Sequence, residues 1–215
     1  MSIGHLVAFA GVAALIIAIP GPSVVFTISR ALTHGRRVAL LNVAGNSLGL
    51  AVQAVAVAFG LGIAVQRSAE VFTVVKLAGG AYLIYLGVQA VRHRQSLAEA
   101  VGSRSRSRIR ALSPLEAVRD GAVVGMTNPK TIAFMVALLP QFAAPAAGHL
   151  PAQLLVLGML FPLIALVLDS VWALAAGTVS QWLSSSPRRL AAVGGAGGLA
   201  MIGIGVSLAV TGRKD

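Results

Sequence analysis

The chain contains no cysteine among its 215 residues. Disulfide bonds, thiolate metal sites and thiol chemistry are therefore excluded. Charged residues are also scarce, at 11%, whereas 57% of the residues are hydrophobic and the mean hydropathy is +0.86. Because a soluble domain carries roughly a quarter of charged residues, this composition indicates an integral membrane protein.

Motifs for nucleotide hydrolysis and for hydrolase chemistry are missing as well. No Walker A sequence occurs, and neither Gly-x-Ser-x-Gly nor His-Glu-x-x-His is found. The four histidines fall in loops and at the ends of apolar segments, without the spacing of metal ligands. We therefore predict that the chain is not an enzyme and that it uses no cofactor and no bound metal.

Long apolar runs dominate what is present. A helix needs about 20 apolar residues to cross the hydrocarbon core, and six segments meet that length. They run from about Leu6 to Ser29, Val38 to Val65, Val71 to Val91, Gly121 to Phe142, Leu150 to Val179 and Leu190 to Val210. We predict an all-α membrane protein with six transmembrane helices in a single membrane domain, residues 1–215.

The net charge of +11 is unevenly distributed between the loops. Twelve arginines fall in the loops after the first, third and fifth segments: Arg30, Arg36, Arg37, Arg92, Arg94, Arg104, Arg106, Arg108, Arg110, Arg119, Arg188 and Arg189. The positive-inside rule makes that face cytoplasmic and puts both termini in the periplasm. No aromatic residues interleave with the basic run 104–110, so anionic lipids are favoured over nucleic acid as its partner.

The basic loop, about residues 92–119, divides the chain into two halves of three segments each, about 1–91 and 120–215. Because three is an odd number, the halves insert with opposite orientation. Each half opens with a segment that contains an internal proline beside a small or amide residue. Paired interruptions in equivalent segments are typical of transporters built from inverted repeats, so we predict a 3+3 inverted repeat with broken helices 1 and 4.

The two interruptions are Pro20-Gly21-Pro22 and Asn128-Pro129. Proline lacks an N–H and its ring clashes with the preceding turn, so backbone carbonyls near it lose their helical partners. Such backbone persists at membrane depth only where protein or a water-filled cavity supplies partners, and the ends of half-helices can bind ions. The alternative is a proline kink that serves packing alone, but two matched breaks favour a binding site.

Polar residues within the spans are the other candidates. Asp169 is the only carboxylate deep in an apolar run, which favours a proton-coupling role, although a structural hydrogen bond or salt bridge, to Lys130 or Lys76, is an open alternative. Asn46 lies on a polar stripe of the second segment, where it lines a polar path or serves packing, whereas Gln53 is assigned to packing. Glycines at four-residue spacing predict close helix packing and are also compatible with a homodimer.

Taken together and in this order, several motifs resemble the LysE/RhtB family of amino-acid exporters, of the threonine, homoserine and lysine efflux type. The motifs are Pro20-Gly21-Pro22, the glycines Gly35, Gly45 and Gly49, the run from Lys76 to Gly87, the run from Gly125 to Lys130, and Leu139 to Phe142. This resemblance implies a bacterial inner-membrane protein that exports amino acids or small derivatives and is driven by the proton gradient.

From these observations we predict a secondary transporter that works by alternating access. The predicted substrate-binding residues are Pro20, Gly21, Pro22, Asn46, Asn128, Pro129 and Lys130, with Asp169 in proton coupling. Backbone N–H groups at the breaks and Lys130 are assigned to the substrate carboxylate, and Asp169 either pairs with the α-ammonium group or exchanges a proton. A passive channel, a membrane scaffold and a metal-ion exporter remain the alternatives.

Overall fold

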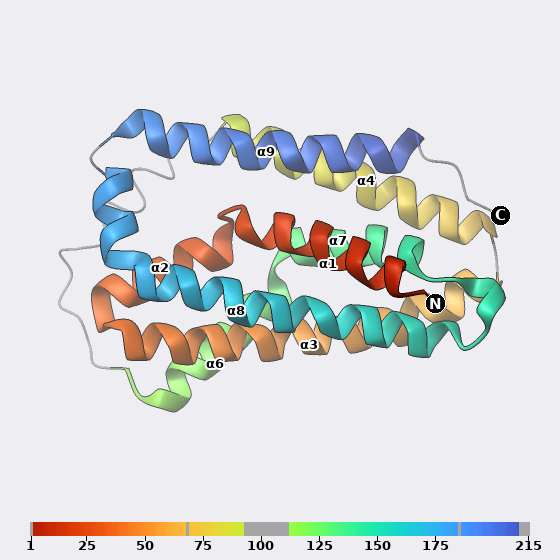
Figure 1. Ribbon diagram of the computed structural model, residues 1–215, viewed down its shortest axis with the longest axis horizontal. Helices are drawn as coiled ribbons and strands as arrows, with labels where there is room; N and C mark the ends of the chain where they lie inside the picture. The colour runs from red at the N-terminus through yellow and green to blue at the C-terminus, as the bar shows by residue number, and fades with distance from the viewer. Residues whose placement is uncertain (1, 68, 93–111, 185, 211–215) are drawn as a thin grey trace.

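A computed structural model of the chain describes residues 2–67, 69–92, 112–184 and 186–210. Within these ranges every regular element is a helix, which confirms the all-α prediction, and the helices lie mostly along one long direction (Figure 1). The elements are α1 (Ile3–Ala18), α2 (Pro22–His34), α3 (Arg36–Arg67), α4 (Ala69–Arg92), α6 (Pro114–Thr127), α7 (Pro129–Leu138), the 3-10 helices η2 (Leu139–Phe142) and η3 (Pro145–Ala147), α8 (Leu150–Ser184) and α9 (Pro187–Val210).

Each of the six predicted apolar segments falls inside one helix or one bent pair of helices. The helices extend past the predicted limits, because hydropathy does not register capping. At the start of α6, Ser113 Oγ accepts from the backbone N–H of Glu116 at 3.2 Å, and the Glu116 carboxylate accepts from the N–H of Ser113 at 2.9 Å. This capping box starts the helix seven residues before the predicted Gly121.

Length and hydropathy support fewer membrane spans than predicted. In the described residues, α3 and α8 are long and apolar enough to cross a bilayer alone, and the bent pairs α1–α2 and α6–α7 meet the same criterion as pairs. The described part of the chain thus holds two to four candidate spans. The six-span inverted repeat therefore stays a prediction.

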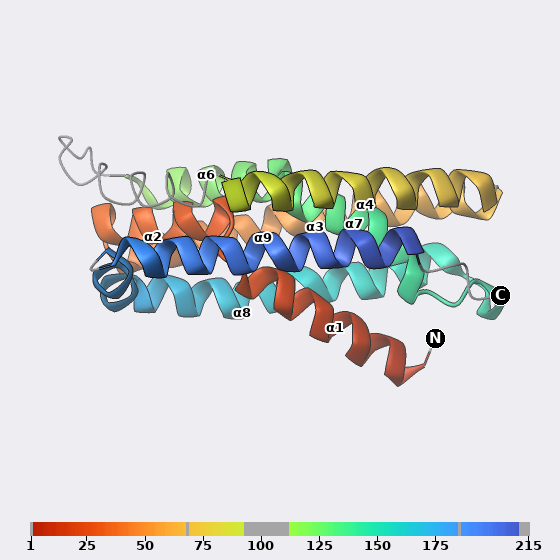
Figure 2. The ribbon, with the colours of Figure 1, turned by 90° about the horizontal axis from the view of Figure 1, so that it is seen from above.

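The two predicted helix breaks are present. The axes of α1 and α2 differ by 53° across Pro20-Gly21, and those of α6 and α7 differ by 47° across Asn128. Pro22 and Pro129 each occupy the first turn of the following helix, where a missing N–H costs nothing. By contrast, Pro162 lies inside α8 and the helix continues through it. Figure 2 shows how α1 tilts away from the direction of the long helices.

Glycines bring α3 and α6 into backbone contact. A Cβ atom added to Gly45 would lie 2.0 Å from the carbonyl oxygen of Val118, and one added to Gly121 would lie 2.0 Å from that of Asn42. Gly125 in turn lies against the backbone of Asn46. The predicted role of this glycine spacing in close helix packing is thereby confirmed for α3 and α6.

A second glycine contact joins α4 to α9, which lie side by side in Figures 1 and 2. A Cβ added to Gly87 would lie 2.5 Å from the carbonyl oxygen of Gly198. A Cβ added to Gly198 would likewise lie 2.5 Å from the carbonyl oxygen of Gly87. One added to Gly205 would lie 2.6 Å from the carbonyl oxygen of Gly80. These helices are therefore also in backbone contact, although slightly less closely than α3 and α6.

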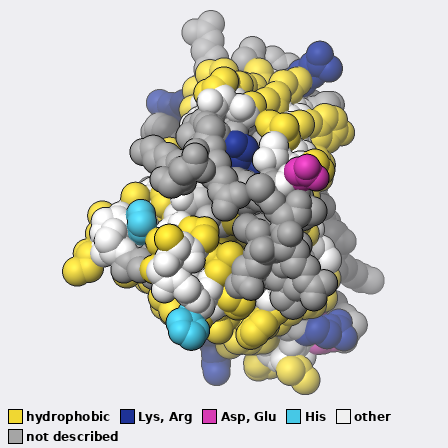
Figure 3. All heavy atoms as spheres, turned by 90° about the vertical axis from the view of Figure 1, so that its right-hand side faces the viewer, with side chains coloured by type: hydrophobic (Ala, Val, Ile, Leu, Met, Phe, Trp, Pro, Cys, Tyr) yellow, Lys and Arg dark blue, Asp and Glu magenta, His cyan; other side chains and the backbone are white. Residues whose placement is uncertain are grey.

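Several of the described arginines lie at one end of the molecule. In Figure 1, α1 begins and α9 ends toward the right, whereas α2 ends and α3, α6 and α9 begin toward the left. The described arginines of that left end are Arg30, Arg36, Arg37, Arg119 and Arg189. Figure 3 looks onto the opposite end, where hydrophobic and histidine side chains are prominent. Residues 93–111, most of the predicted basic loop, lie outside the described ranges.

One ion pair at the arginine-rich end connects the two halves of the chain. Arg30 on α2 donates to the Asp120 carboxylate on α6 at 2.8 Å. Arg119 lies 3.5 Å from the other oxygen of the same carboxylate, and the Arg30 guanidinium lies 4.7 Å from the centre of the Phe26 ring. Both partners are partly exposed, so we expect this pair to contribute at most about 1 kcal/mol.

Candidate functional site

The two helix breaks face each other. Asn128, between α6 and α7, donates from Nδ2 to Ser23 Oγ on the first turn of α2 at 3.2 Å. Its Oδ1 accepts from the backbone N–H of Lys130 at 3.1 Å, which caps α7. A single buried amide therefore joins the N-terminal ends of α2 and α7, helices that come from different halves of the chain.

The carbonyl end of α1 is capped by Lys130 of α7. The ammonium group donates to the carbonyl oxygen of Ile16 at 3.0 Å and to that of Ile19 at 2.9 Å. Only 4% of the Lys130 side chain is exposed. The last carbonyls of a helix lack helical partners and carry the negative end of the helix dipole, so a buried cation is stabilised there.

Gly21 makes room for this lysine. A Cβ at position 21 would lie 3.0 Å from Lys130 Nζ and 3.2 Å from Cε. A methyl group at Gly21 would therefore press on the lysine while it donates to α1. The glycine of the Pro-Gly-Pro break is thus needed for space beside the ammonium group.

The carbonyl end of α6 has a different cap. Gln53 of α3 donates from Nε2 to the carbonyl oxygens of Gly125 at 2.9 Å and Met126 at 2.7 Å. Its Oε1 accepts from the Thr131 hydroxyl on α7 at 3.0 Å. Both broken helices therefore have their unpaired carbonyls satisfied by side chains from another element, which is how irregular backbone is accommodated away from water.

Replacing Gln53 with leucine should lower the stability of the fold. The substitution leaves one buried and one partly buried carbonyl of α6 without their donor, and a buried unpaired carbonyl costs about 1–3 kcal/mol. We expect a clear fall in the thermal midpoint of the purified protein in detergent. Gln89→Leu, on an exposed position of α4, is the control and should change the midpoint little. An unchanged midpoint for Gln53→Leu would refute the capping role.

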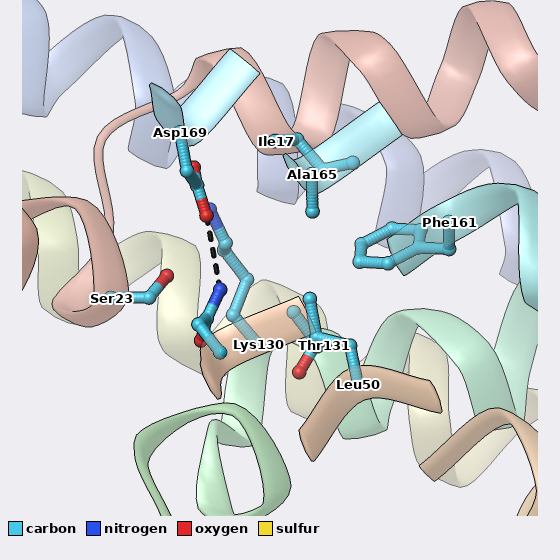
Figure 4. Close-up of a pocket in the computed structure, with 9 residues that line it drawn as sticks. Ile17, Ser23, Leu50, Lys130, Thr131, Phe161, Ala165 and Asp169 are labelled. Atoms are coloured by element: carbon cyan, nitrogen blue, oxygen red, sulfur yellow. Dashed lines mark hydrogen bonds between the residues drawn. The ribbon is translucent and has the colours of Figure 1, made fainter. Parts of the chain in front are cut away.

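A small cavity lies between the breaks and α8 (Figure 4). It is lined by Ile17, Ser23, Asn46, Leu50, Lys130, Thr131, Phe161, Ala165 and Asp169. The three residues from α8 are spaced by four and therefore share one face of the helix. The space open to a water centre is about 10 Å³, room for roughly one water molecule. The cavity is thus too small in this structure to hold an amino acid.

Asp169 is the acidic group of this cavity. Its side chain is 2% exposed, and Oδ2 accepts from Asn46 Nδ2 at 3.0 Å. Within the described residues, Asp169 Oδ1 and Asn46 Oδ1 are buried without a hydrogen-bond donor. Lys130 reaches into the same cavity but donates to α1 (Figure 4). The predicted structural hydrogen bond to Asp169 therefore exists, and its partner is Asn46.

The structure brings the predicted site residues together to different degrees. Asn46, Lys130 and Asp169 line the cavity, Asn128 lies buried beside it, and Gly21 contacts Lys130. Pro20, Pro22 and Pro129 shape the breaks and are partly or largely exposed.

Sequence reasoning missed two kinds of residue in this site. Ser23 and Thr131 each follow a break proline by one or two positions, a signal that could have identified them. The apolar lining residues carried no such signal. Ile17, Leu50, Phe161 and Ala165 look like any other apolar residue of a span.

Comparisons with known proteins identify the relatives of this chain. The family model of the LysE type translocator matches residues 14–212. The homoserine/homoserine lactone efflux protein of Salmonella typhimurium is 33% identical over 190 residues, 88% of each chain. An uncharacterized membrane protein of Vibrio cholerae is 40% identical over 158 residues, 73% of this chain and 74% of that one. The leucine efflux protein of Enterobacter sp. (strain 638) is 28% identical over 198 residues, 90% of each chain. No solved structure matches the chain.

The family match spans both helix breaks and every residue that lines the cavity. It confirms the resemblance that the motifs indicated. Translocators move solutes and are not enzymes, and the apolar helices suit a multi-pass membrane protein. The chain therefore belongs to the LysE type translocator family and is a membrane transporter rather than an enzyme.

Proposed function

We propose that the chain is a secondary transporter that exports amino acids or small amino-acid derivatives across the bacterial inner membrane, coupled to the proton gradient. The observation that carries this proposal is the meeting of two broken helices around a small cavity with a buried lysine and a buried aspartate. Charged groups inside a membrane bundle are costly and are typical of substrate and proton pathways.

The proposed cycle is alternating access between two inverted halves, about residues 1–91 and 120–215 of one membrane domain. Two pairings support it, because α3 packs on α8 and α4 packs on α9, which are equivalent elements of the halves. With six spans, the arginine-rich end is cytoplasmic, both termini are periplasmic, and anionic lipids neutralise the basic loop. The glycine-rich helix faces also permit the chain to form a homodimer.

The proposed substrate class follows from the relatives. Homoserine, homoserine lactone and leucine share an α-ammonium group beside an acyl carbon, whereas the lactone has no free carboxylate. For substrates with a carboxylate, the N–H groups that open α2 and α7 are suited to receive it, since the first turn of a helix has unpaired donors. Asp169 either pairs with the α-ammonium group or exchanges the coupling proton.

Counterflow in proteoliposomes tests the proposal. The purified chain is reconstituted with unlabelled homoserine or leucine inside, and labelled amino acid is added outside. A carrier accelerates uptake of the label by exchange, so we expect transient accumulation several-fold above liposomes without internal substrate. Flux without acceleration would indicate a passive channel, and no flux a scaffold. Transport of divalent metal ions instead of amino acids would indicate a metal-ion exporter.

A further inference from the structure

Two acceptors of the cavity, Asp169 Oδ1 and Asn46 Oδ1, are buried and without a donor in the described residues. The ammonium group of Lys130, which also lines the cavity, donates to two further acceptors, the carbonyl oxygens of Ile16 and Ile19 at the end of α1. We call these four oxygens the acceptor cluster. Such a cluster is suited to a group with several N–H donors and a positive charge.

One such group already contacts part of the cluster. The ammonium group of Lys130 donates to both carbonyls of α1, and Lys130 is the one cation among the described residues that line the cavity. A primary ammonium has three donors, and only two are used in these contacts. A substrate α-ammonium group carries the same charge and the same three donors.

We propose that the acceptor cluster is the binding subsite for the α-ammonium group of the substrate, and that the ammonium group of Lys130 fills it when the carrier is empty. This inference rests on the proposed export of amino acids and their derivatives. The ligand class is a primary ammonium next to an acyl group, with or without a free carboxylate.

The subsite links binding to movement. While Lys130 of α7 donates to α1, the two halves of the chain are held together across the breaks. A substrate ammonium that takes its place releases this contact and leaves the breaks free to separate. The empty carrier closes again when Lys130 returns. Lys130 is thus a tethered competitor of the substrate and also the group that closes the empty site.

Lys130→Met tests the subsite, because methionine keeps an unbranched side chain, one atom shorter than lysine, and removes the charge. In this variant no lysine competes for the acceptor cluster, and no cation of the protein lies near Asp169. The ammonium group of the substrate should therefore bind more tightly. We expect the half-saturating homoserine concentration in counterflow to fall about tenfold, which corresponds to about 1.4 kcal/mol. Net export should fall at least tenfold, because the empty carrier no longer closes.

Added methylammonium provides a second readout. It supplies a free ammonium group that fits the subsite, so it should restore part of the net export of Lys130→Met. In the original chain, where Lys130 already closes the empty site, it can only compete with the substrate and should not raise net export. A lysine with a purely structural role would not be replaced by an amine in solution. Lys76→Met removes another buried lysine, on α4 and away from the cavity, and is the matched control that should transport normally.

Two results would overturn the inference. If Lys130→Met weakens homoserine binding and leaves homoserine lactone binding unchanged, Lys130 binds the substrate carboxylate. If Lys130→Met exchanges homoserine with unaltered affinity, the lysine does not compete for the site. Absence of counterflow in the original chain would instead count against the proposed function itself.

Gly21→Ala is a second test of the competition between Lys130 and the substrate, for use if Lys130→Met does not fold. Its methyl group would lie 3.0 Å from Lys130 Nζ and should weaken the contact with α1 without removing the charge. We expect a several-fold lower half-saturating concentration and slower net export. Gly11→Ala, on α1 with no atom near the added methyl group, is the control. Unchanged affinity in Gly21→Ala would contradict the proposal.

Discussion

Replacing Asp169 with asparagine is expected to reduce proton-driven export about 100-fold. Asparagine keeps the shape and can still accept a hydrogen bond from Asn46, but it cannot carry a proton or a negative charge. Loss of one member of a buried charged site costs about 2–5 kcal/mol, and each 1.36 kcal/mol is tenfold in rate. The measurement is export from proteoliposomes driven by an imposed pH gradient.

Counterflow without a gradient separates the two roles left open for Asp169. If the carboxylate only exchanges protons, counterflow by Asp169→Asn persists with unchanged affinity. If it also belongs to the acceptor cluster, as proposed, the half-saturating substrate concentration rises about tenfold. Asp120→Asn, in the partly exposed ion pair with Arg30, is the control and should retain proton-driven export. Full proton-driven export by Asp169→Asn would remove this residue from the coupling mechanism.

Gly121→Ala should be among the most destabilising substitutions in the chain. The added methyl group would lie 2.0 Å from the carbonyl oxygen of Asn42 and 2.9 Å from the backbone nitrogen of Asn46. Backbone atoms cannot rotate away, so α3 and α6 must separate, and overpacking of this kind costs about 1–3 kcal/mol or more. We expect most of the protein to be lost as aggregate in size-exclusion chromatography.

Gly60→Ala is the matched control for this substitution. Gly60 lies in α3, and a Cβ there would meet no atom within 4 Å. Alanine favours helix over glycine by about 1 kcal/mol, so Gly60→Ala should be as stable as the original chain or more so. Equal stability of Gly121→Ala and Gly60→Ala would show that the close approach of α3 and α6 is not required.

The glycine contacts also determine where the site lies. Gly121 and Gly125 rest on the backbone of Asn42 and Asn46, and Asn46 donates to Asp169. The approach of α6 therefore fixes the position of α3 beside the cavity. Substitutions at these glycines should alter transport even in the fraction of protein that still folds, because they displace Asn46.

Local features of the site were predictable from sequence. Proline removes a helical hydrogen bond wherever it stands inside a span, so the breaks at Pro20-Gly21-Pro22 and Asn128-Pro129 could be located without a structure. Burial of Asp169 likewise follows from its apolar neighbours. Each of these inferences depends on the chemistry of a few consecutive residues.

Contacts between distant segments could not be inferred in this way. Lys130 was assigned to a substrate carboxylate because it follows Pro129, whereas the structure shows it donating to Ile16 and Ile19. Gln53 was assigned to packing, yet it caps the carbonyl end of α6. In both cases the spacing of residues identifies a polar group, but not the helix end that lies opposite it.

The absence of cysteine allows a direct test of the central claim, that the two breaks face each other in a working carrier. Ser23 Oγ and Asn128 Nδ2 lie 3.2 Å apart, so the thiols of Ser23→Cys/Asn128→Cys come within the span of a short crosslinker. Arg30→Cys/Asp120→Cys, from the ion pair between the same halves, is the positive control for crosslinking.

The decisive measurement is counterflow by the Ser23→Cys/Asn128→Cys protein before and after treatment of membranes with a short thiol crosslinker that reductant cleaves. We predict that the pair crosslinks, that counterflow then stops, and that reduction restores it. Failure of this pair to crosslink while the control pair does, or undiminished counterflow in the crosslinked protein, would contradict a carrier whose two halves separate at the breaks.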